Sequence, residues 1–410
     1  MYFLYNLAIL GASFFLKIIA AFNSKLRLFV RGRKETFPYL KSHISATDEF
    51  LWIHAASLGE FEQGLPVIEK LRREYPRHKI LITFFSPSGY EIKKNTKAAD
   101  LVCYLPMDTR HNAKEFIATI KPKIAIFIKY EIWPNYLREL ERVGVPAVLV
   151  SAIFKREQIY FKWYGGFMRR SLAKMKHVFV QNKESEQLLR TIDLKQVTVS
   201  GDTRFDRVTE ILDRDNTLPF MERFKKERNC LVGGSTWPED EKILLPFVNN
   251  SQEPMVYVLA PHDIKKDHIQ DLHKAISKKT VLYSEIKGVN LDEVEVLILD
   301  TIGLLTRVYS YADIAYVGGG FATGLHNTLE PAVFAIPVII GPNYSGFREA
   351  EELVQERGIF SVKSAEEFRD LTNLLLNKEA REKAGKINAT YINKNKGASV
   401  QIIRYIRTLL

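Results

Sequence analysis

Cysteine is nearly absent from this chain of 410 residues, which contains two cysteines, Cys103 and Cys230. Because they lie far apart and neither belongs to a C-x-x-C pair, we expect neither a disulfide scaffold nor a cysteine zinc site. The nine histidines include no H-E-x-x-H pair, and no aspartate-rich loop resembles a calcium site. These absences favour a reducing cytosol and a protein that works without a bound metal or cofactor.

Acidic residues are in deficit. The 48 Asp and Glu residues are outnumbered by 59 Lys and Arg residues, which gives a formal net charge of +11 at pH 7. A basic chain suggests an anionic partner, such as nucleic acid, a membrane surface or a phosphorylated substrate.

Long apolar runs are also rare, and the one long run lies at the N-terminus. Residues 2–22 are almost all apolar, with Asn6 and Lys17 as the interruptions. The run is close to the ~20 residues that a bilayer core requires, and basic residues follow it directly. We therefore expect residues 1–24 to anchor the chain in a membrane and leave the rest in the cytoplasm, which argues against nucleic acid. The anchor either spans the bilayer or lies partly in its surface, and a buried first helix is the alternative.

Beyond this segment, apolar runs alternate with amphipathic stretches, which is typical of α/β proteins with parallel sheets. In the first half we expect strands at 50–55, 79–83, 101–104, 124–128, 147–151, 177–181 and 197–201. In the second half we expect them at 230–234, 255–260, 281–283, 295–300, 314–317 and 337–340. A polar stretch near position 206 separates the halves. We predict two doubly wound, Rossmann-like domains, 25–206 and 207–410, that face a cleft, with the last helix able to pack back on the first domain.

In such sheets ligands bind beyond the carboxyl ends of the strands, so the loops after strands are the candidate sites. The stretch from Gly318 to Pro331 predicts a strand end, a glycine-rich loop and a helix start, with Asn327 and Glu330 at capping-box spacing. Free backbone N–H groups at such a helix start suit a phosphate. An ordinary strand-to-helix turn has the same local pattern.

Carboxylates follow two strands of the first half. Glu60 comes three residues after Ser57, so it is either part of a capping box or a general base toward a hydroxyl group. Glu131 follows another strand in the same layer. His54 is better explained as a strand-end histidine with satisfied hydrogen bonds, and Arg204, near the domain junction, as a solvated arginine.

Hydroxyl groups and small residues follow strands of the second half. Ser235 and Thr236 can cap the next helix, bind phosphate, or both. The stretches Pro261-His262 and Asp300 to Leu305 end further strands at the same edge.

The order of these motifs is more specific than any one of them. They are His54-Ala-Ala-Ser-Leu-Gly-Glu60, Glu131-Ile-Trp-Pro-Asn135, Gly201-Asp-Thr-Arg-Phe-Asp206, Gly234-Ser-Thr236, Pro261-His262, Asp300-Thr-Ile-Gly303 and His326-Asn-Thr-Leu-Glu-Pro331. In this order they resemble the motifs of the 3-deoxy-manno-octulosonic acid (Kdo) transferases, and the resemblance covers nearly the whole chain.

The resemblance implies a GT-B glycosyltransferase that moves Kdo from CMP-Kdo to a hydroxyl group of the lipid A precursor, lipid IVA. It implies inversion at the anomeric carbon, no bound metal, and a place in lipopolysaccharide biosynthesis on the cytoplasmic face of the inner membrane. By the same resemblance Glu60 is the general base, and Glu131 and Arg204 support the transition state.

The resemblance also assigns the CMP-Kdo site to the second domain. Its residues are Ser235, Thr236, Pro261, His262, Ile302, Gly303, Leu304, His326, Asn327, Thr328, Leu329 and Glu330. Helix N-termini would hold the phosphate, and Glu330 would accept ribose hydroxyl groups.

The chain departs from the family pattern at single positions. The family usually has Glu at Lys129, Lys at Arg204, Arg at His262, Glu at Leu304 and Gly at Leu325. Lys265 or Lys266 would be the nearest replacements for the missing arginine cation.

Three interpretations stay open from the residues. The basic and aromatic stretch 154–164 either holds the phosphorylated lipid or is a solvated helix with buried aromatics. Another GT-B enzyme, with a UDP-sugar or CDP-linked donor, is the main enzymatic alternative. A membrane-tethered protein that binds nucleotide or anionic lipid without catalysis is the alternative from another class.

Overall fold

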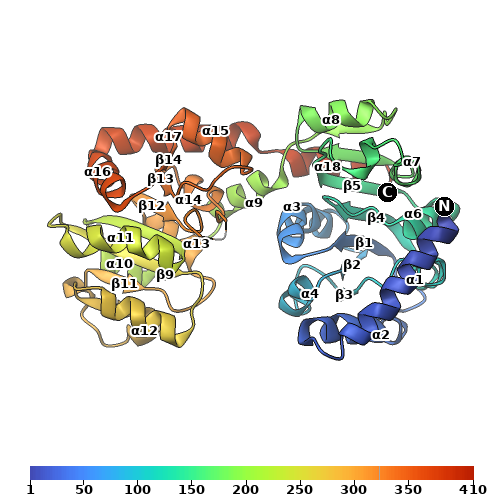
Figure 1. The fold of residues 1–410 in the computed structure, drawn as a ribbon, viewed down its shortest axis with the longest axis horizontal. Coiled ribbons are helices and arrows are strands. Elements are labelled where there is room, and N and C mark those ends of the chain that lie inside the picture. Colours follow the sequence, from blue (N-terminus) through green and yellow to red (C-terminus); the bar gives the residue numbers. More distant parts are fainter. Residues whose placement is uncertain (323) are drawn as a thin grey trace. The chain divides into compact units, whose positions relative to one another are not determined.

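A computed structural model describes residues 1–322 and 324–410 of the chain. They form two compact units, one made of Met1–Arg207 with Lys396–Leu410 and the other of Val208–Asn395. Each unit has one seven-stranded parallel sheet with helices against it (Figure 1). The predicted α/β fold with two doubly wound domains is confirmed.

The sheet of unit 1 has the strand order β3-β2-β1-β4-β5-β6-β7. Its strands are β1 (Phe50–Ala55), β2 (Lys79–Phe84), β3 (Leu101–Tyr104), β4 (Pro122–Ile128), β5 (Ala147–Ala152), β6 (His177–Val180) and β7 (Val197–Val199). Its helices are α1 (Tyr2–Ile19), α2 (Ser24–His43), α3 (Leu58–Glu74), α4 (Pro87–Lys93), α5 (Arg110–Ile120), α6 (Pro134–Arg142), η1 (Ile159–Phe161), α7 (Gly166–Leu172), α8 (Lys183–Arg190) and α18 (Ala398–Ile406).

The central strand β1 shows why this sheet is buried on both faces. Phe50 and Trp52 belong to one core cluster, and Leu51 and Ile53 belong to the cluster on the opposite face. Alternate side chains of a strand point to opposite faces, so a strand covered on both sides reads as a continuous apolar run.

The sheet of unit 2 has the order β10-β11-β9-β8-β12-β13-β14. Its strands are β8 (Asn229–Thr236), β9 (Met255–Pro261), β10 (Thr280–Leu282), β11 (Val296–Ile298), β12 (Ile314–Val317), β13 (Val338–Ile340) and β14 (Ile359–Ser361). Its helices are α10 (Pro219–Lys225), α11 (Pro238–Asn250), α12 (Lys266–Ala275), η2 (Tyr283–Glu285), η3 (Leu291–Glu293), α13 (Leu305–Val308), η4 (Tyr309–Tyr311), α14 (Leu329–Ala332), α15 (Arg348–Glu356), α16 (Ala365–Leu375) and α17 (Lys378–Asn395). Every predicted strand forms, and β14 is an addition.

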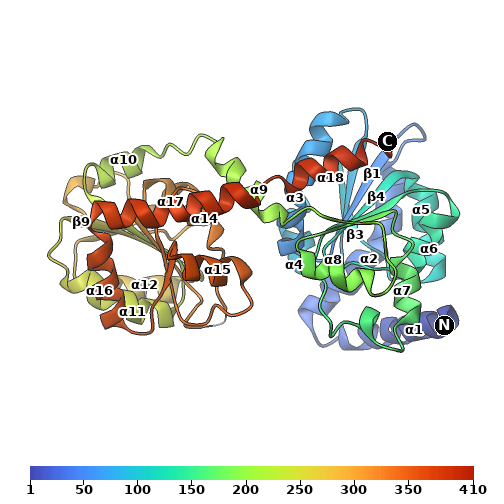
Figure 2. The ribbon, with the colours of Figure 1, turned by 90° about the horizontal axis from the view of Figure 1, so that it is seen from above.

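The chain passes from unit 1 to unit 2 within α9 (Thr203–Leu212) and returns after α17. Figure 2 shows α17 leading into α18, and α18 packs on α3. Ile402, Ile403 and Ile406 of α18 enter the core of unit 1. Asp206 holds the start of α18, because its carboxylate accepts hydrogen bonds from the backbone N–H groups of residues 397 and 399.

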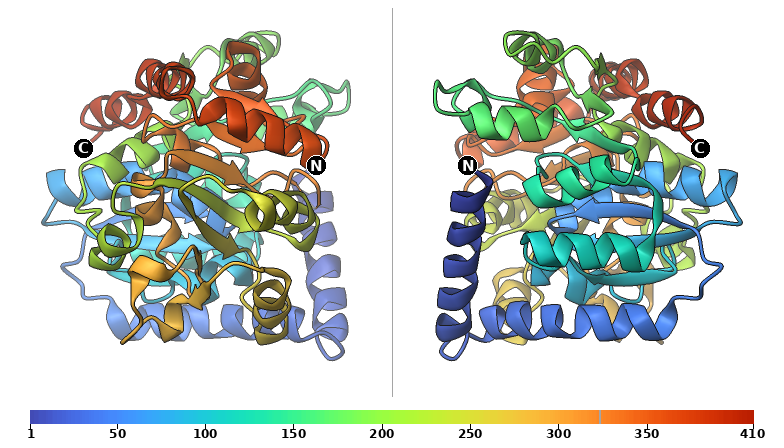
Figure 3. Two further views of the ribbon diagram at one scale, coloured as in Figure 1. Left: turned by 90° about the vertical axis from the view of Figure 1, so that its left-hand side faces the viewer. Right: turned by 90° about the vertical axis from the view of Figure 1, so that its right-hand side faces the viewer.

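Helix α1 is long and apolar enough to cross a membrane, and none of its residues is buried. It meets α2 in the form of an L (Figure 3). Its first two turns contact the rest of unit 1: Tyr5 Oη donates to Asp108 Oδ2 (2.7 Å), and the backbone N–H of Arg110 donates to Asn6 Oδ1 (3.1 Å). The anchor predicted for residues 1–24 is therefore a surface helix fixed to unit 1 at its N-terminal end.

Candidate functional site

Glu60 lies in the first turn of α3, directly beyond the carboxyl end of β1. Ser57 is the N-cap, and its hydroxyl accepts a hydrogen bond from the Glu60 N–H. The Glu60 carboxylate, however, accepts from the backbone N–H of Ala56 (2.5 Å). Ser57 thus caps the helix as predicted, and the Glu60 side chain reaches back to the backbone before the helix.

The environment of Glu60 makes its carboxyl group a better base. Burial and, second to it, the nearby Glu131 carboxylate raise the pKa of Glu60 to about 7, while the Ala56 N–H and the Lys129 ammonium act in the opposite direction. A base whose pKa is close to the working pH is partly ionised and still accepts protons readily. Glu60 is therefore suited to remove a proton from a hydroxyl group.

Glu131 follows β4 and is held by two ring N–H groups. Trp133 Nε1 donates to Glu131 Oε2 (2.8 Å), and His54 Nε2 lies 3.1 Å from the same oxygen. The other nitrogen of His54 contacts the carbonyl and hydroxyl oxygens of Thr83 (3.1 and 2.9 Å). His54 is fully buried and bonded on both sides, so it positions Glu131.

Arg204, at the start of α9, is tied to α3 through Asp202. Arg204 Nε donates to Asp202 Oδ2 (2.8 Å), and Gln63 Nε2 donates to Asp202 Oδ1 (3.0 Å). The pKa of Tyr130 is raised by burial and by the charges of Glu60 and Asp202. The Arg204 guanidinium acts in the opposite direction. The structure thus brings the three predicted catalytic residues to the same edge of the unit 1 sheet.

Lys129, directly after β4, has an unusual backbone conformation. Its φ of 68° lies in the left-handed region, which costs a residue other than glycine about 1–3 kcal/mol. Its ammonium lies 5.2 Å from the centroid of the Tyr130 ring. The strained turn directs the chain after β4 so that Glu131 reaches the His54 side of the site.

Three aromatic rings stack at the carboxyl edge of the unit 2 sheet. Trp237, His262 and His326 follow the neighbouring strands β8, β9 and β12, and the two imidazole centroids lie 4.5 Å apart. The indole centroid of Trp237 lies 4.7 Å from that of His262. Trp237 Nε1 donates to His326 Nε2 (3.0 Å), so this nitrogen carries no proton. Burial and the neighbouring His262 lower the pKa of His326, which agrees with a neutral ring at pH 7.

The glycine-rich loop is fixed by a residue that the sequence patterns did not single out. Asp240, fully buried in α11, accepts hydrogen bonds from Tyr316 Oη (2.7 Å) and from the backbone N–H groups of Trp237 (2.9 Å) and Gly319 (2.8 Å). A Cβ at Gly318 would lie 2.2 Å from the carbonyl oxygen of Ser235, so only glycine lets the loop pass here. Asp240 therefore joins the ends of β8 and β12.

The prediction that this loop offers free N–H groups to a phosphate is wrong for several of them. Gly318 donates to the Gly234 carbonyl, Gly324 to the Gly319 carbonyl, and His326 to the Gly318 carbonyl. The Gly319 N–H is held by Asp240. These bonds shape the loop, so a ligand there meets side chains more than backbone donors.

The helix after the loop also differs from the prediction. It begins at Leu329 with Thr328 as N-cap and has four residues. Asn327 Oδ1 accepts from the Leu329 N–H (3.1 Å), whereas the Glu330 carboxylate accepts from the Asn327 side chain (3.0 Å) and from Thr306 Oγ1 (2.9 Å). Asn327 and Glu330 thus interact, but side chain to side chain.

Thr236 is held by a second buried acid. Its hydroxyl donates to Glu241 Oε1 (3.0 Å), and His268 Nε2 lies 2.9 Å from Glu241 Oε2. Its neighbour Ser235 has a φ of 53°, which is again left-handed. Lys129 and Ser235 are thus strained residues at strand ends of the two units, and such strain is typical of functional sites.

The remaining predicted donor residues lie at the same edge of unit 2 but differ in exposure. Pro261 and Leu329 are buried, Ile302 is 85% exposed, and Leu304 is half-buried before α13. Gly303 has a φ of 96°, which a glycine adopts without strain.

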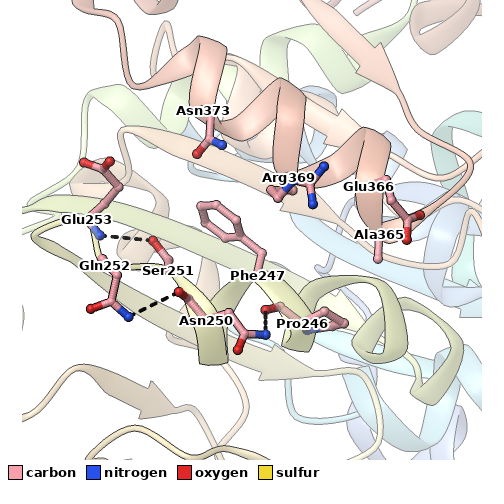
Figure 4. A pocket seen from close by; sticks show the side chains of 10 residues that line it. All are labelled: Pro246, Phe247, Asn250, Ser251, Gln252, Glu253, Ala365, Glu366, Arg369 and Asn373. Atoms are coloured by element: carbon pink, nitrogen blue, oxygen red, sulfur yellow. Dashed lines mark hydrogen bonds between the residues drawn. The ribbon is translucent and has the colours of Figure 1, made fainter.

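A cavity of about 340 Å³ lies elsewhere on unit 2, between the end of α11 and α16 (Figure 4). Its polar groups are paired locally, as in Asn250 Nδ2 to the Pro246 carbonyl (2.7 Å). None of its residues belongs to a loop that follows a strand. We therefore place the candidate site at the strand ends.

Comparison with known proteins supports one family. Residues 30–207 match the family model described as 3-Deoxy-D-manno-octulosonic-acid transferase (kdotransferase). The 3-deoxy-D-manno-octulosonic acid transferase of Aquifex aeolicus is 29% identical over 88% of this chain and 96% of that protein. The enzyme of the same name from Haemophilus influenzae is 26% identical over 88% of this chain and 87% of that protein.

Solved structures support the fold. UDP-GlcNAc 2-epimerase from Neisseria meningitidis superposes with a TM-score of 0.63 at 15% identity, over 88% of this chain and all of that one (100%). MurG from Acinetobacter baumannii superposes with a TM-score of 0.53 at 12% identity, over 88% and 99%. At these identities the likeness concerns the fold, which is GT-B.

Proposed function

Because the chain belongs to the 3-deoxy-D-manno-octulosonic acid transferase family and is a glycosyltransferase, we propose that it transfers Kdo from CMP-Kdo to lipid IVA. The observation that carries the proposal is a half-buried Glu60 with a pKa of about 7, beside Glu131, at the strand end where the family motif lies. Residues 25–206 are proposed to bind the acceptor and residues 207–410 the donor.

In the proposed reaction the Glu60 carboxylate takes the proton of the acceptor hydroxyl group. The hydroxyl oxygen then bonds to the anomeric carbon of Kdo from the side opposite the phosphate, and the bond from that carbon to the CMP phosphate oxygen breaks. CMP leaves with the bonding electrons, and the anomeric centre is inverted. Glu60 supports this role because its protonated form is stable in its buried position.

Glu131 and Arg204 are proposed to act on the charges of this reaction. The Glu131 carboxylate raises the pKa of Glu60. His54 and Trp133 hold the Glu131 carboxylate in place. The Arg204 side chain is 39% exposed and is oriented by Asp202, so an anion can approach it. A fixed cation stabilises the departing phosphate or the Kdo carboxylate without reorganisation.

The donor is proposed to bind at the ring stack of unit 2. His262 is exposed and carries one face of the stack, so it is the residue best placed to contact the CMP phosphate where relatives have arginine. Lys265 is a weaker replacement, because its ammonium already pairs with Asp263 (2.6 Å). The Ser235 hydroxyl lies at the strained end of β8 and is proposed as a second phosphate ligand.

A donor screen tests this function against the alternative GT-B enzymes. The purified full-length chain is incubated with lipid IVA and CMP-Kdo, a UDP-sugar or a CDP-linked donor in separate reactions. We expect CMP release and a Kdo-bearing lipid product from the first reaction only. Turnover only with UDP or CDP donors would replace the Kdo assignment, and no turnover with any donor would favour a binding protein.

The chain is proposed to reach its lipid acceptor at the cytoplasmic face of the inner membrane through α1. The helix presents a row of exposed apolar side chains: Phe3, Leu4, Leu7, Leu10, Phe14, Phe15, Ile18 and Ile19. Its first turns bond to Asp108 and to the start of α5, and spanning the bilayer would break these bonds. We therefore propose that α1 lies along the membrane surface, with Trp163 and Tyr164 as further exposed aromatics next to α7.

Replacement of one exposed apolar residue of α1 is expected to weaken this membrane contact. Phe14→Glu should lower the fraction of protein that floats with vesicles, with a partition coefficient at least about tenfold lower, because burying one aromatic ring is worth about 1.5–3 kcal/mol. Ile92→Glu is the matched control, since Ile92 is 62% exposed on α4 of the same unit. Equal losses for the two variants would contradict the surface-helix proposal.

A further inference from the structure

A separate cavity of about 320 Å³ lies in unit 1 between α1, α2 and the chain that follows β3. Its residues are Ser13, Leu16, Lys17, Phe29, Val30, Arg33, Lys34, Phe37, Pro106, Met107 and Asn112. The α1 residues among them lie on one side of the helix, at spacings of three and four residues, so the cavity opens along the helix proposed to meet the membrane.

The cavity combines apolar walls with positive charge. Lys17, Arg33 and Lys34 contribute three cations, and no Asp or Glu lines it. Phe37 and Met107 supply apolar surface beside these cations. This combination suits a ligand with one anionic group and an apolar tail.

Arg33 is the most constrained of these cations. Its guanidinium stacks on Phe29 (3.5 Å to the ring centroid) and lies over Phe85 (4.6 Å), and it donates to the carbonyl oxygens of the same two residues. No carboxylate within residues 1–322 and 324–410 forms an ion pair with it. Burial lowers the pKa of Arg33 to about 9, with Tyr104 acting in the opposite direction. A buried cation without a counter-charge is stabilised by an incoming anion.

Two polar atoms at this cavity have no hydrogen-bond partner. They are the buried Oγ of Ser13 and the buried Nε of Arg33, for which the described part of the chain supplies none. Buried donors without partners are rare in proteins, because each costs about 1–3 kcal/mol. Ser13 and Arg33 both line the cavity, so these unpaired groups belong to the walls of the proposed anion site.

We propose that this cavity binds one anionic phospholipid of the membrane, with its phosphate at Lys17, Arg33 and Lys34 and the first methylenes of an acyl chain against Phe37 and Met107. A structural lipid at this place goes beyond the transferase reaction. The cavity, at about 320 Å³, has room for a phosphate group and the first methylenes of one acyl chain.

Bound lipid would fix α1 and α2 together at the membrane. The phosphate would join Lys17 of α1 to Arg33 and Lys34 of α2. Hydrogen bonds from Arg27 to the carbonyl oxygens of residues 20 and 21 already link the two helices at their turn. The proposed lipid is thus a structural ligand for the L formed by the two helices (Figure 3).

Native mass spectrometry of the full-length chain in a neutral detergent tests the proposal. Dioleoyl phosphatidylglycerol, dioleoyl phosphatidylcholine and glycerol 3-phosphate are added separately. We expect one retained phosphatidylglycerol, at least about tenfold weaker retention of phosphatidylcholine, and no retention of glycerol 3-phosphate, which lacks the apolar part. Equal retention of the two lipids, or retention of glycerol 3-phosphate as strong as that of phosphatidylglycerol, would overturn the proposal.

Variants locate the lipid. Val30→Trp fills the cavity without a change of charge and should abolish retention of phosphatidylglycerol. Lys34→Gln should weaken retention about fivefold, because one basic side chain near an anionic lipid is worth about 1 kcal/mol. Arg31→Gln removes the same charge from an exposed position of α2 outside the cavity and should leave retention unchanged. A similar loss for Lys34→Gln and Arg31→Gln would show nonspecific attraction and overturn the site, even if Val30→Trp fails to fold.

Discussion

Glu60→Gln is expected to lower the rate of Kdo transfer from CMP-Kdo by about a hundredfold or more, because general base catalysis typically contributes about 10²–10⁴-fold. Glutamine keeps the shape and the hydrogen bond to the Ala56 N–H but cannot take a proton. The measurement is product formation by the purified chain with lipid IVA, with EDTA present, since the family resemblance implies a reaction without a metal.

The matched control is Glu69→Gln, which changes the same residue type on the same helix. Glu69 is partly exposed, and its ion pair with Arg207 is long (4.0 Å). Its activity should stay within about twofold of the native chain. A Glu60→Gln variant that retains full transfer activity would remove Glu60 from the reaction.

The pH profile provides a second measure of the same group. Because burial raises the pKa of Glu60 to about 7, the carboxylate that acts as base is depleted below that pH and complete above it. We expect kcat/KM to rise with pH up to about 7 and then to level off. The residual activity of Glu60→Gln should lack this rise, and an identical profile in that variant would assign the pKa to another group.

Arg204→Gln is expected to lower kcat by about a hundredfold to a thousandfold, which is the cost of removing one group that stabilises transition-state charge. Arg204→Lys should keep most of the activity, because it retains the cation, although lysine lacks the planar fork that binds Asp202. The measurement is kcat and KM for CMP-Kdo at saturating acceptor.

A structural role for Arg204 would lower the thermal midpoint of Arg204→Gln. We expect instead a midpoint close to that of the native chain, because Gln63 still holds Asp202 when Arg204 is replaced. Arg190→Gln is the control, since Arg190 is exposed and pairs with Glu186 on α8. Loss of activity in Arg204→Lys as large as in Arg204→Gln, or a large fall in the midpoint, would contradict the electrostatic role.

Much of the fold could be predicted because its signal is local. Strands covered on both faces are continuous apolar runs, so β3 and β12 were placed with their observed ends. Strand β14 is not predicted from the sequence, although β7 and β10, which are as short and also lie at sheet edges, are predicted. The apolar residues of β14 are Ile359 and Phe360, and the polar Ser361 ends the run.

The site was only partly predictable because some of its bonds join distant segments. Glu60, Glu131 and Arg204 were named from motif order, and the structure places them at one edge. The role of Asp240 depends on Tyr316 and Gly319, which lie 76 and 79 residues away. The sequence offers one signal for Asp240: it lies three residues after Trp237, at the position where an acid in the first turn bonds to the N-cap backbone. The hydrogen bond from the Gly318 N–H to the Gly234 carbonyl has no corresponding pattern in the sequence.

The return of α18 to unit 1 has a consequence for synthesis on the ribosome. Unit 2 is an insertion between residues 207 and 396, so its sequence is complete before the residues of α18 are translated. Unit 1, although it begins first, lacks Ile402, Ile403 and Ile406 of its core until the end of translation. The unit that carries Glu60 therefore completes its core last, and the nascent chain can form unit 2 while unit 1 still has an open face on α3.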